Sequence, residues 1–228
     1  METYTKNMIS ILVSTRNRQD MFKIMFQSVL DTAFNKSNIE FSVYRDDDDN
    51  SIYEYPPNCK ETRGKRINPE LAINECQKIA TGPYYIFIPD DLIFETRDWD
   101  KQVIDEFDKC KDKILLVHFN DHNYKPNWGT AGCLHKNWID TVGYMMPPEL
   151  CRHGDAWLHE VGKQINRRVF LPDVFYKDYK IKNDQTHLEY SKEIERTNPK
   201  TKYFSREMRK ARKRDAKKLQ DFIDNFKQ

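Results

Sequence analysis

Two hydrophobic periods alternate along the first part of the chain. Residues 8–14 form a continuous apolar run, which is typical of a buried and usually parallel strand. Apolar residues then recur at helical spacing from Met21 to Ala33. The alternation of apolar and polar side chains at 39–43 predicts a second strand. The order is therefore strand, helix, strand, and both strands run into polar clusters.

The alternation continues beyond this first unit. Asn68 and Pro69 suit the N-cap and the first position of a helix, and an apolar stripe follows them to Ala80. In order along the remaining chain, the pattern predicts a buried strand at 84–88, a helix at 99–107, a strand at 114–119, loops with a short helix at 138–142, a helix at 154–165, a short strand at 169–171, an irregular segment at 176–199 and a basic amphipathic helix from Lys200.

Alternating strands and helices, with polar residues at successive strand ends, predict an open α/β sheet flanked by helices. In such sheets ligands bind at the carboxyl ends of the strands, so we expect a site there. We interpret residues 1–199 as one domain and residues 200–228 as a helical extension packed on it.

The composition excludes several classes of protein. All seven glycines lie between Gly64 and Gly162, and neither a G-x-G-x-x-G stretch nor a P-loop is present. No run of 18 apolar residues occurs, so we expect no transmembrane segment, and the polar start predicts no signal peptide. The five cysteines form no C-x-x-C pair, which argues against a zinc site or disulfide framework and favours a reducing, cytoplasmic setting.

The net charge of +2 combines two unlike parts. Residues 200–228 hold 11 Lys and Arg against 4 Asp and Glu, a net of +7, so residues 1–199 have a net charge of −5. We expect the apolar positions of this tail to dock on the domain, with residues 206–218 facing outward. The outward face is either a solvated basic surface or a contact for a polyanion such as DNA.

Asp90 and Asp91 form the sharpest local motif, because they stand between apolar runs at the end of a buried strand. Adjacent carboxylates repel unless a positive group lies beside them. A divalent cation is the usual solution, and hard Mg²⁺ or Mn²⁺ prefers oxygen ligands. A solvated turn is the alternative. The four acids at 46–49 follow another strand, and Asp46 is favoured among them for a ribose or base contact.

The order of these motifs resembles a known family. The first strand ends in Thr15-Arg16-Asn17-Arg18, the second ends at Asp46, Arg63 and Asn68 precede a helix, and the stretch from Ala80 to Asp91 reads A-T-G-P-Y-Y-I-F-I-P-D-D. This set is similar to the GT-A glycosyltransferases, most of all the inverting family-2-like members, over roughly residues 8–190. The resemblance implies a GT-A fold, which is a Rossmann-like open mixed sheet flanked by helices.

The resemblance also implies roles on the donor side. Asp91 matches the metal-binding acid and Asp90 the acid near the ribose, although the usual D-x-D has an acid where this chain has Pro89. Thr15, Arg16 and Asp46 would contact the nucleotide. Arg63, Asn68 and Lys65 belong to the segment that would approach the donor, where Arg63 and Lys65 could meet the diphosphate. A late histidine, His187, would be a further ligand of Mn²⁺ or Mg²⁺. The alternative for each Arg and Lys is plain surface charge.

On the acceptor side, the resemblance matches Asp155 to the acid that deprotonates the acceptor hydroxyl. A helix-start acid that complements the helix dipole is the structural alternative. Trp128 and Gly129 would lie beside the sugar and acceptor, with Trp128 either stacking on a sugar or packing in the core. His153 is a possible neighbour of the base.

The resulting hypothesis is a metal-assisted, inverting transfer of a hexosyl or pentosyl group from a nucleoside-diphosphate sugar, such as a UDP-sugar, to an acceptor hydroxyl. The acceptor would be a glycan or a hydroxymethylated DNA base. The Lys- and Asn-rich style resembles phage or viral enzymes, for which the host cytoplasm would be the setting. Two alternatives stay open: a nucleotidyltransferase, against which the glycine-free turn at 15–18 argues, and an inactive GT-A-like module that binds a polyanion.

Overall fold

A computed structural model describes residues 7–123, 125–150, 152–179, 188, 189, 192 and 203–227. These residues build one eight-stranded mixed sheet, in the order β3-β2-β1-β4-β7-β6-β8-β5. The strands are β1 (Ile9–Thr15), β2 (Ile39–Asp46), β3 (Cys59–Gly64), β4 (Tyr84–Phe87), β5 (Leu92–Phe94), β6 (Leu116–Asn120), β7 (Gly132–His135) and β8 (Arg168–Asp178).

The first four strands along one half of the sheet are parallel. β1 pairs with β2 and β4, and β2 pairs with β3, all in parallel register. β7 is antiparallel to both β4 and β6, and β5 is antiparallel to β8. Because parallel strands end on one side, the carboxyl ends of β1, β2 and β4 meet at one edge of the sheet.

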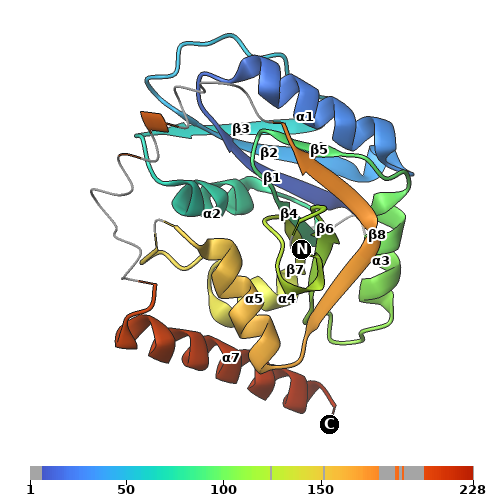
Figure 1. The fold of residues 1–228 in the computed structure, drawn as a ribbon, viewed down its shortest axis with the longest axis vertical. Coiled ribbons are helices and arrows are strands. Elements are labelled where there is room, and N and C mark those ends of the chain that lie inside the picture. The colour runs from blue at the N-terminus through green and yellow to red at the C-terminus, as the bar shows by residue number, and fades with distance from the viewer. Residues whose placement is uncertain are drawn as a thin grey trace.

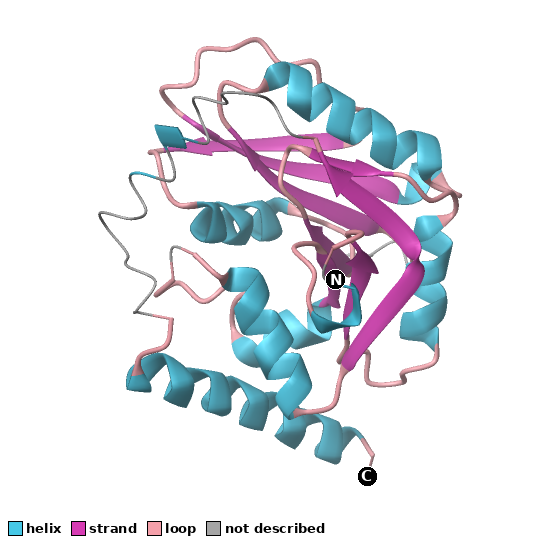
Figure 2. Cartoon of the chain, in the orientation of Figure 1, coloured by secondary structure: helices cyan, strands magenta, loops and turns pink. Residues whose placement is uncertain are grey.

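Helices cover both faces of the sheet (Figures 1 and 2). One face is covered by α1 and α3, and the other by α2, α4 and α5, with α7 as the outermost layer. The helices are α1 (Gln19–Thr32), α2 (Pro69–Ile79), α3 (Trp99–Asp108), α4 (Lys136–Val142), α5 (Gly154–Gln164) and α7 (Arg206–Phe226), with 3₁₀ turns η1 (Lys36–Asn38) and η2 (Lys125–Asn127).

The hydrophobic core has two halves, one on each face of the sheet. In β1, Ile9, Ile11 and Val13 pack under α1 and α3, while Leu12 packs under α2 on the other face. Successive side chains of a strand point to opposite faces, so a strand buried on both faces is largely apolar, and the buried Ser10 of β1 is satisfied by donating to Glu40. This is the physical origin of the continuous apolar run that predicts β1.

The sheet confirms the expected α/β class, but several elements differ from the prediction. β3, β5 and β7 had no predicted counterpart, and β7 lies in a region expected to be loops. β8 was predicted as a short strand at 169–171 but runs to Asp178, so Tyr176 to Asp178, expected to be irregular, are strand residues that pair with β5.

Helix α7 packs against α4 and α5. Met208, Leu219 and Ile223 enter the core on this face, as the apolar spacing predicts. The expectation that residues 206–218 face outward is wrong at Arg212 and Asp215, which are 6% and 0% exposed. Among the described residues, no helix combines the length and apolar character that a membrane span requires.

The two buried charges of α7 are both satisfied. Asp215 accepts hydrogen bonds from the Tyr144 hydroxyl and from Trp157 Nε1, the latter at 3.1 Å. Arg212 donates to the carbonyl of Tyr203 at 3.1 Å and lies over the rings of Tyr203 and Trp157. The contacts of Asp215 with Tyr144, which follows α4, and with Trp157 of α5 therefore determine which side of α7 faces these helices.

Candidate functional site

A cavity of about 760 Å³ opens at the carboxyl edge of the sheet. Its walls come from the ends of β1, β2 and β4 and from the first turns of α2 and α5. The charged lining residues are Arg16, Arg18, Arg66, Asp46, Glu70, Asp90, Asp91, Asp155 and Asp178. Thus three cationic and six acidic side chains face one space.

The end of β1 is joined to the acidic pair that follows β4. The Thr15 hydroxyl donates to Asp90 Oδ2 at 2.7 Å. Arg18, from the turn after β1, reaches both acids: Nη1 lies 2.5 Å from Asp90 Oδ1 and Nη2 lies 2.8 Å from Asp91 Oδ2. Asp90 is 3% exposed, so its charge is compensated by these bonds rather than by water. The positive group that two adjacent carboxylates require is therefore Arg18 in this structure.

Arg16 and Asp46 form the neighbouring part of the cavity wall. Arg16 Nη1 lies 3.0 Å from Asp46 Oδ2, and the same guanidinium also bonds both oxygens of Asp48. The bond to Asp48 raises the pKa of Arg16. Burial raises the pKa of Asp46 above its ordinary value, against the opposing attraction of Arg16.

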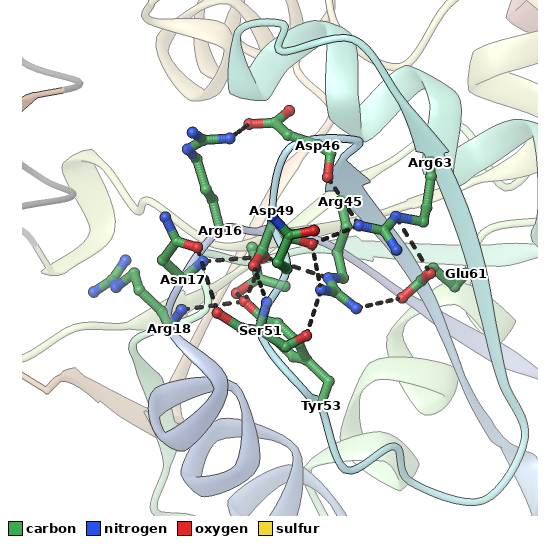
Figure 3. A network of polar contacts seen from close by, with 12 residues as sticks. Arg16, Asn17, Arg18, Arg45, Asp46, Asp49, Ser51, Tyr53, Glu61 and Arg63 are labelled. Atoms are coloured by element: carbon green, nitrogen blue, oxygen red, sulfur yellow. Dashed lines mark hydrogen bonds and ion pairs between the residues drawn. The ribbon is translucent and has the colours of Figure 1, made fainter.

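The loop between β2 and β3 is joined to the turn after β1 by a network of polar contacts (Figure 3). Asp49 is fully buried and its Oδ2 accepts from the backbone N–H of Asn17 and from the Tyr53 hydroxyl, each at 3.1 Å. Burial alone would raise the pKa of Asp49, but hydrogen bonds from Asn17, Ser51 and Arg45 bring it down to about 2. An ionised acid at the centre of the loop thus holds the turn after β1.

The part of the cavity wall formed by α2 and α5 contains two further acids, Glu70 and Asp155. Glu70 lies in the first turn of α2, and its Oε1 accepts from the backbone N–H of Gly154 at 3.4 Å. Its Oε2 is buried and has no hydrogen-bond partner among the described residues. Burial is the main reason that the pKa of Glu70 rises to about 7.

Asp155 follows Gly154 in the first turn of α5. Its Oδ1 accepts from the N–H of Ala156 at 2.8 Å, and its Oδ2 accepts from Trp128 Nε1 at 3.2 Å. Burial raises the pKa of Asp155, and these two bonds oppose the rise. The Trp128 ring stacks on His159 at 5.5 Å between centroids, so Trp128 both orients Asp155 and packs on α5.

Gly154, at the start of α5, is closely surrounded by the side chains of neighbouring elements. A Cβ on Gly154 would lie 2.7 Å from Met146 Sδ and 2.9 Å from Glu70 Cγ. Both distances are below a normal contact, so a larger residue at position 154 would push the side chains of Met146 and Glu70 away from their places beside Asp155.

The structure brings six of the predicted site residues to this cavity: Thr15, Arg16, Asp46, Asp90, Asp91 and Asp155. It does not bring Arg63, Asn68, Trp128, Gly129 or His153 to the lining. Arg63 Nη2 instead donates to the carbonyl of Asp49 at 2.6 Å, and the Asn68 side chain caps α2 by accepting from the N–H of Leu71 at 2.9 Å.

The acceptor-side residues Gly129 and His153 also lie outside the lining. The N–H of Gly129 bonds His159 Nε2 at 3.1 Å, and His153 is the N-cap residue of α5 with a φ of 72°. His187 lies outside the described residues.

Several lining residues were not predicted. Arg18 was given no specific role in the predicted site, although it belongs to the same turn as Thr15 and Arg16. Glu70 directly follows Pro69, where an acid normally only complements a helix dipole. Asp178 joins the cavity because β8 is longer than its pattern indicates. Of these, Arg18 had the clearest signal, since it stands three residues beyond Thr15 at a strand end.

The donor set fits a divalent cation only in part. The described residues contain no group of three His, Cys, Asp or Glu side chains that could hold a metal by themselves. Asp91 Oδ1 is nevertheless left without a hydrogen bond from any described residue, and Asp91 faces the cavity. Mg²⁺ and similar ions are often held by one or two carboxylates together with substrate phosphates. The residues therefore fit an ion that is completed by a phosphate ligand.

Comparison with known proteins places the fold. The sequence matches no family model and no curated protein. The structure is similar to the Pyrobaculum calidifontis mannosyltransferase PcManGT, solved with GDP-Man and Mn²⁺, with a TM-score of 0.62 and 13% identity over 94% of this chain and 69% of that chain. The fold is of the GT-A type.

A second similar structure belongs to Staphylococcus aureus TarS. Its residues 1–349 in complex with UDP-GlcNAc match with a TM-score of 0.57 and 16% identity, over 77% of this chain and 60% of that chain. The same TarS segment in complex with UDP matches with a TM-score of 0.54. The chain thus spans less than two thirds of the TarS segment.

Proposed function

We propose that the chain is a glycosyltransferase that moves a hexosyl or pentosyl group from a nucleoside-diphosphate sugar to an acceptor hydroxyl. The observation that carries the proposal is that one cavity joins Asp46, the Asp90–Asp91 pair and Asp155. The similar structures support it, since one is a mannosyltransferase solved with GDP-Man and the other, TarS, was solved with UDP-GlcNAc and with UDP. The acceptor would be a glycan or a hydroxymethylated DNA base.

The charge of the cavity supports metal assistance. Six acids against three arginines would repel a diphosphate. A Mg²⁺ or Mn²⁺ ion at Asp91 would reverse this repulsion and neutralise the charge of the leaving diphosphate. Thr15 keeps Asp90 in place, and Arg16 and Asp46 offer a donor and an acceptor to the nucleotide. The PcManGT complex contains Mn²⁺, which is consistent with this role.

Asp155 would be the general base. The acceptor hydroxyl loses its proton to Asp155 as its oxygen bonds the anomeric carbon, while the bond from that carbon to the diphosphate oxygen breaks. The electron pair of the broken bond leaves with the nucleoside diphosphate. Direct displacement inverts the anomeric configuration. Trp128 Nε1 holds one oxygen of Asp155 in place by a hydrogen bond. The raised pKa of Asp155 makes this residue a stronger base than a solvated aspartate.

A screen of donors tests the proposal. UDP-, GDP- and dTDP-sugars are titrated into the protein in the presence of Mn²⁺ and their binding is measured by calorimetry. The donor that binds is then tested for hydrolysis and for transfer of its sugar to glycan and hydroxymethylated DNA acceptors. We expect one nucleotide class to bind and its sugar donor to turn over. Absence of both binding and turnover for all three classes would reject the glycosyltransferase function.

A further inference from the structure

Arg18 occupies the place that a cation needs. Its guanidinium forks between Asp90 Oδ1 and Asp91 Oδ2, and the Arg18 side chain is only 13% exposed. The turn that carries it is fixed, because the backbone N–H of Arg18 donates to the Tyr53 hydroxyl at 3.1 Å. A forked, charge-assisted contact of this kind is among the stronger polar interactions in proteins.

An ion that binds Asp91 through Oδ2, or that bridges Asp91 Oδ2 to Asp90 Oδ1, would share its oxygen ligands with the Arg18 guanidinium. Two positive groups at one carboxylate oxygen repel each other, so the ion and the Arg18 fork compete for this place. A guanidinium binds phosphate as readily as carboxylate. A diphosphate in the cavity would therefore give the released Arg18 a new partner.

We propose that Arg18 is a latch that competes with the divalent cation for Asp91, so that the cation binds tightly only when a nucleoside diphosphate draws the guanidinium away. This inference rests on the proposed function for the identity of the diphosphate. The competition between Arg18 and the cation does not depend on the proposed function, because it follows from the contacts of Arg18 with Asp90 and Asp91 alone. The latch makes the binding of metal and nucleotide mutually dependent, and it keeps the acidic pair compensated in their absence.

Arg16 offers a matched control for the latch. It lines the same cavity and carries the same charge, but it pairs with Asp46 and the exposed Asp48 rather than with Asp91. Removing Arg16 changes the local potential without freeing a carboxylate of the Asp90–Asp91 pair. Arg18→Lys is a second control, because it keeps the charge and removes the fork.

Mn²⁺ binding is measured by electron paramagnetic resonance on the whole chain without nucleotide. We expect Arg18→Met to bind Mn²⁺ at least about tenfold more tightly than the unchanged chain, Arg18→Lys to lie between them, and Arg16→Met to change the affinity much less. Asp91→Asn added to Arg18→Met should abolish the gain. Circular dichroism and thermal melting confirm that each variant is folded.

The titration is repeated with saturating UDP or GDP, whichever binds. We expect the nucleotide to tighten Mn²⁺ binding to the unchanged chain more than to Arg18→Met. Equal Mn²⁺ affinities of the unchanged chain and Arg18→Met without nucleotide would overturn the latch, as would an equal gain in Arg16→Met. If no nucleotide binds at all, the proposed function fails, whereas the nucleotide-free arm still decides whether Arg18 competes with the ion.

Discussion

Asp155 is a carboxyl on which opposing forces act. Burial favours its neutral form, while the N–H of Ala156, the indole of Trp128 and the N-terminus of α5 favour the carboxylate. The net result is a pKa above the ordinary value of 3.8. A base with a raised pKa accepts a proton more readily.

Asp155→Asn tests this residue directly. The amide keeps the shape and cannot accept the proton, so we expect transfer to fall by about 10²- to 10⁴-fold with donor affinity unchanged. The rate of the unchanged chain should rise with pH through a pKa above 3.8. Steady-state kinetics and calorimetry measure the two effects. Asp173→Asn, at an exposed position of β8, is the control and should leave both the transfer rate and the donor affinity unchanged. A donor affinity lost together with the rate would place Asp155 in binding instead.

Glu70 predicts a pH dependence of stability. Its pKa of about 7 in the folded protein exceeds the ordinary 4.5, so the folded state binds more protons and stability falls as pH rises from about 4.5 to about 7. At pH 7 this costs up to about 3 kcal/mol. Glu70→Gln should remove this loss, which urea unfolding at several pH values measures. Glu75→Gln, on the solvent side of α2, should leave the profile unchanged. Parallel profiles for Glu70→Gln and the unchanged chain would contradict the assignment.

The predictable site residues share one property. Asp46, Asp90 and Asp91 stand at strand ends, where the sheet alone determines that they meet. Glu70 and Asn68 could not be assigned in this way, because both stand at a helix start, where capping is the ordinary role. In the structure, Asn68 caps α2, whereas Glu70 lies buried in the lining of the cavity. The difference depends on the packing of α5 over α2, which no local pattern encodes.

The loop between β2 and β3 acts as one element with the turn after β1. Asp49 accepts from the N–H of Asn17 and from Tyr53, and Tyr53 in turn contacts Arg18. Arg45 forms an ion pair with Asp49, and its guanidinium carbon lies 4.0 Å from the centroid of the Tyr53 ring. The positions of Arg16 and Arg18 in the cavity therefore depend on a residue that does not line it.

We expect Asp49→Asn to weaken nucleotide binding and to destabilise the fold by about 2 kcal/mol, because the charge-assisted hydrogen bonds of this buried carboxylate are lost and Arg45 keeps Glu61 as its remaining ion-pair partner. Calorimetry with UDP or GDP and urea unfolding measure the two losses. Asp47→Asn is the matched control, since Asp47 is exposed in the same loop. Equal stability of the two variants would show that the network does not hold the loop.

β3 and the second half of β8 have sequence patterns that do not indicate a strand. β3 is an edge strand with the charged sequence Cys-Lys-Glu-Thr-Arg-Gly and is only half-buried, so its pattern is weak. β8 changes partner along its length: it pairs with β6 from Arg168 to Leu171 and again at Phe175, and with β5 from Tyr176 to Asp178. Pro172 and Asp173 stand between the two parts and interrupt the apolar alternation. Strand pairing, rather than local propensity, defines these elements.

Across the whole molecule the charges are separated. Acids gather at the cavity, while α7 carries eight Lys and Arg against four Asp and Glu. The buried Asp215 and Arg212 fix which side of α7 faces the domain. The opposite side therefore presents its basic residues at a fixed place on the surface. Arg206, Arg209, Lys210 and Lys213 are exposed there, and none forms an ion pair with a described residue.

This exposed stripe predicts salt-dependent binding of a polyanion. We expect the unchanged chain to bind a 20-base-pair DNA duplex with an affinity that falls steeply as salt rises, because phosphate contacts release counterions. The triple variant Arg209→Glu, Lys210→Glu and Lys213→Glu should lower the slope of log K against log[salt] by about 3. Fluorescence anisotropy between 50 and 200 mM salt, the range in which such contacts typically lose most of their affinity, measures the slope.

The control for this stripe removes charge elsewhere. Lys101→Glu and Lys109→Glu change exposed residues of the α3 region, which covers the other face of the sheet, and should leave the slope close to that of the unchanged chain. Donor binding should be equal in all variants, because the stripe does not line the cavity. A flat salt dependence of the unchanged chain would rule out a nucleic-acid acceptor that docks on α7, and would leave α7 with the packing role that Asp215 and Arg212 already give it.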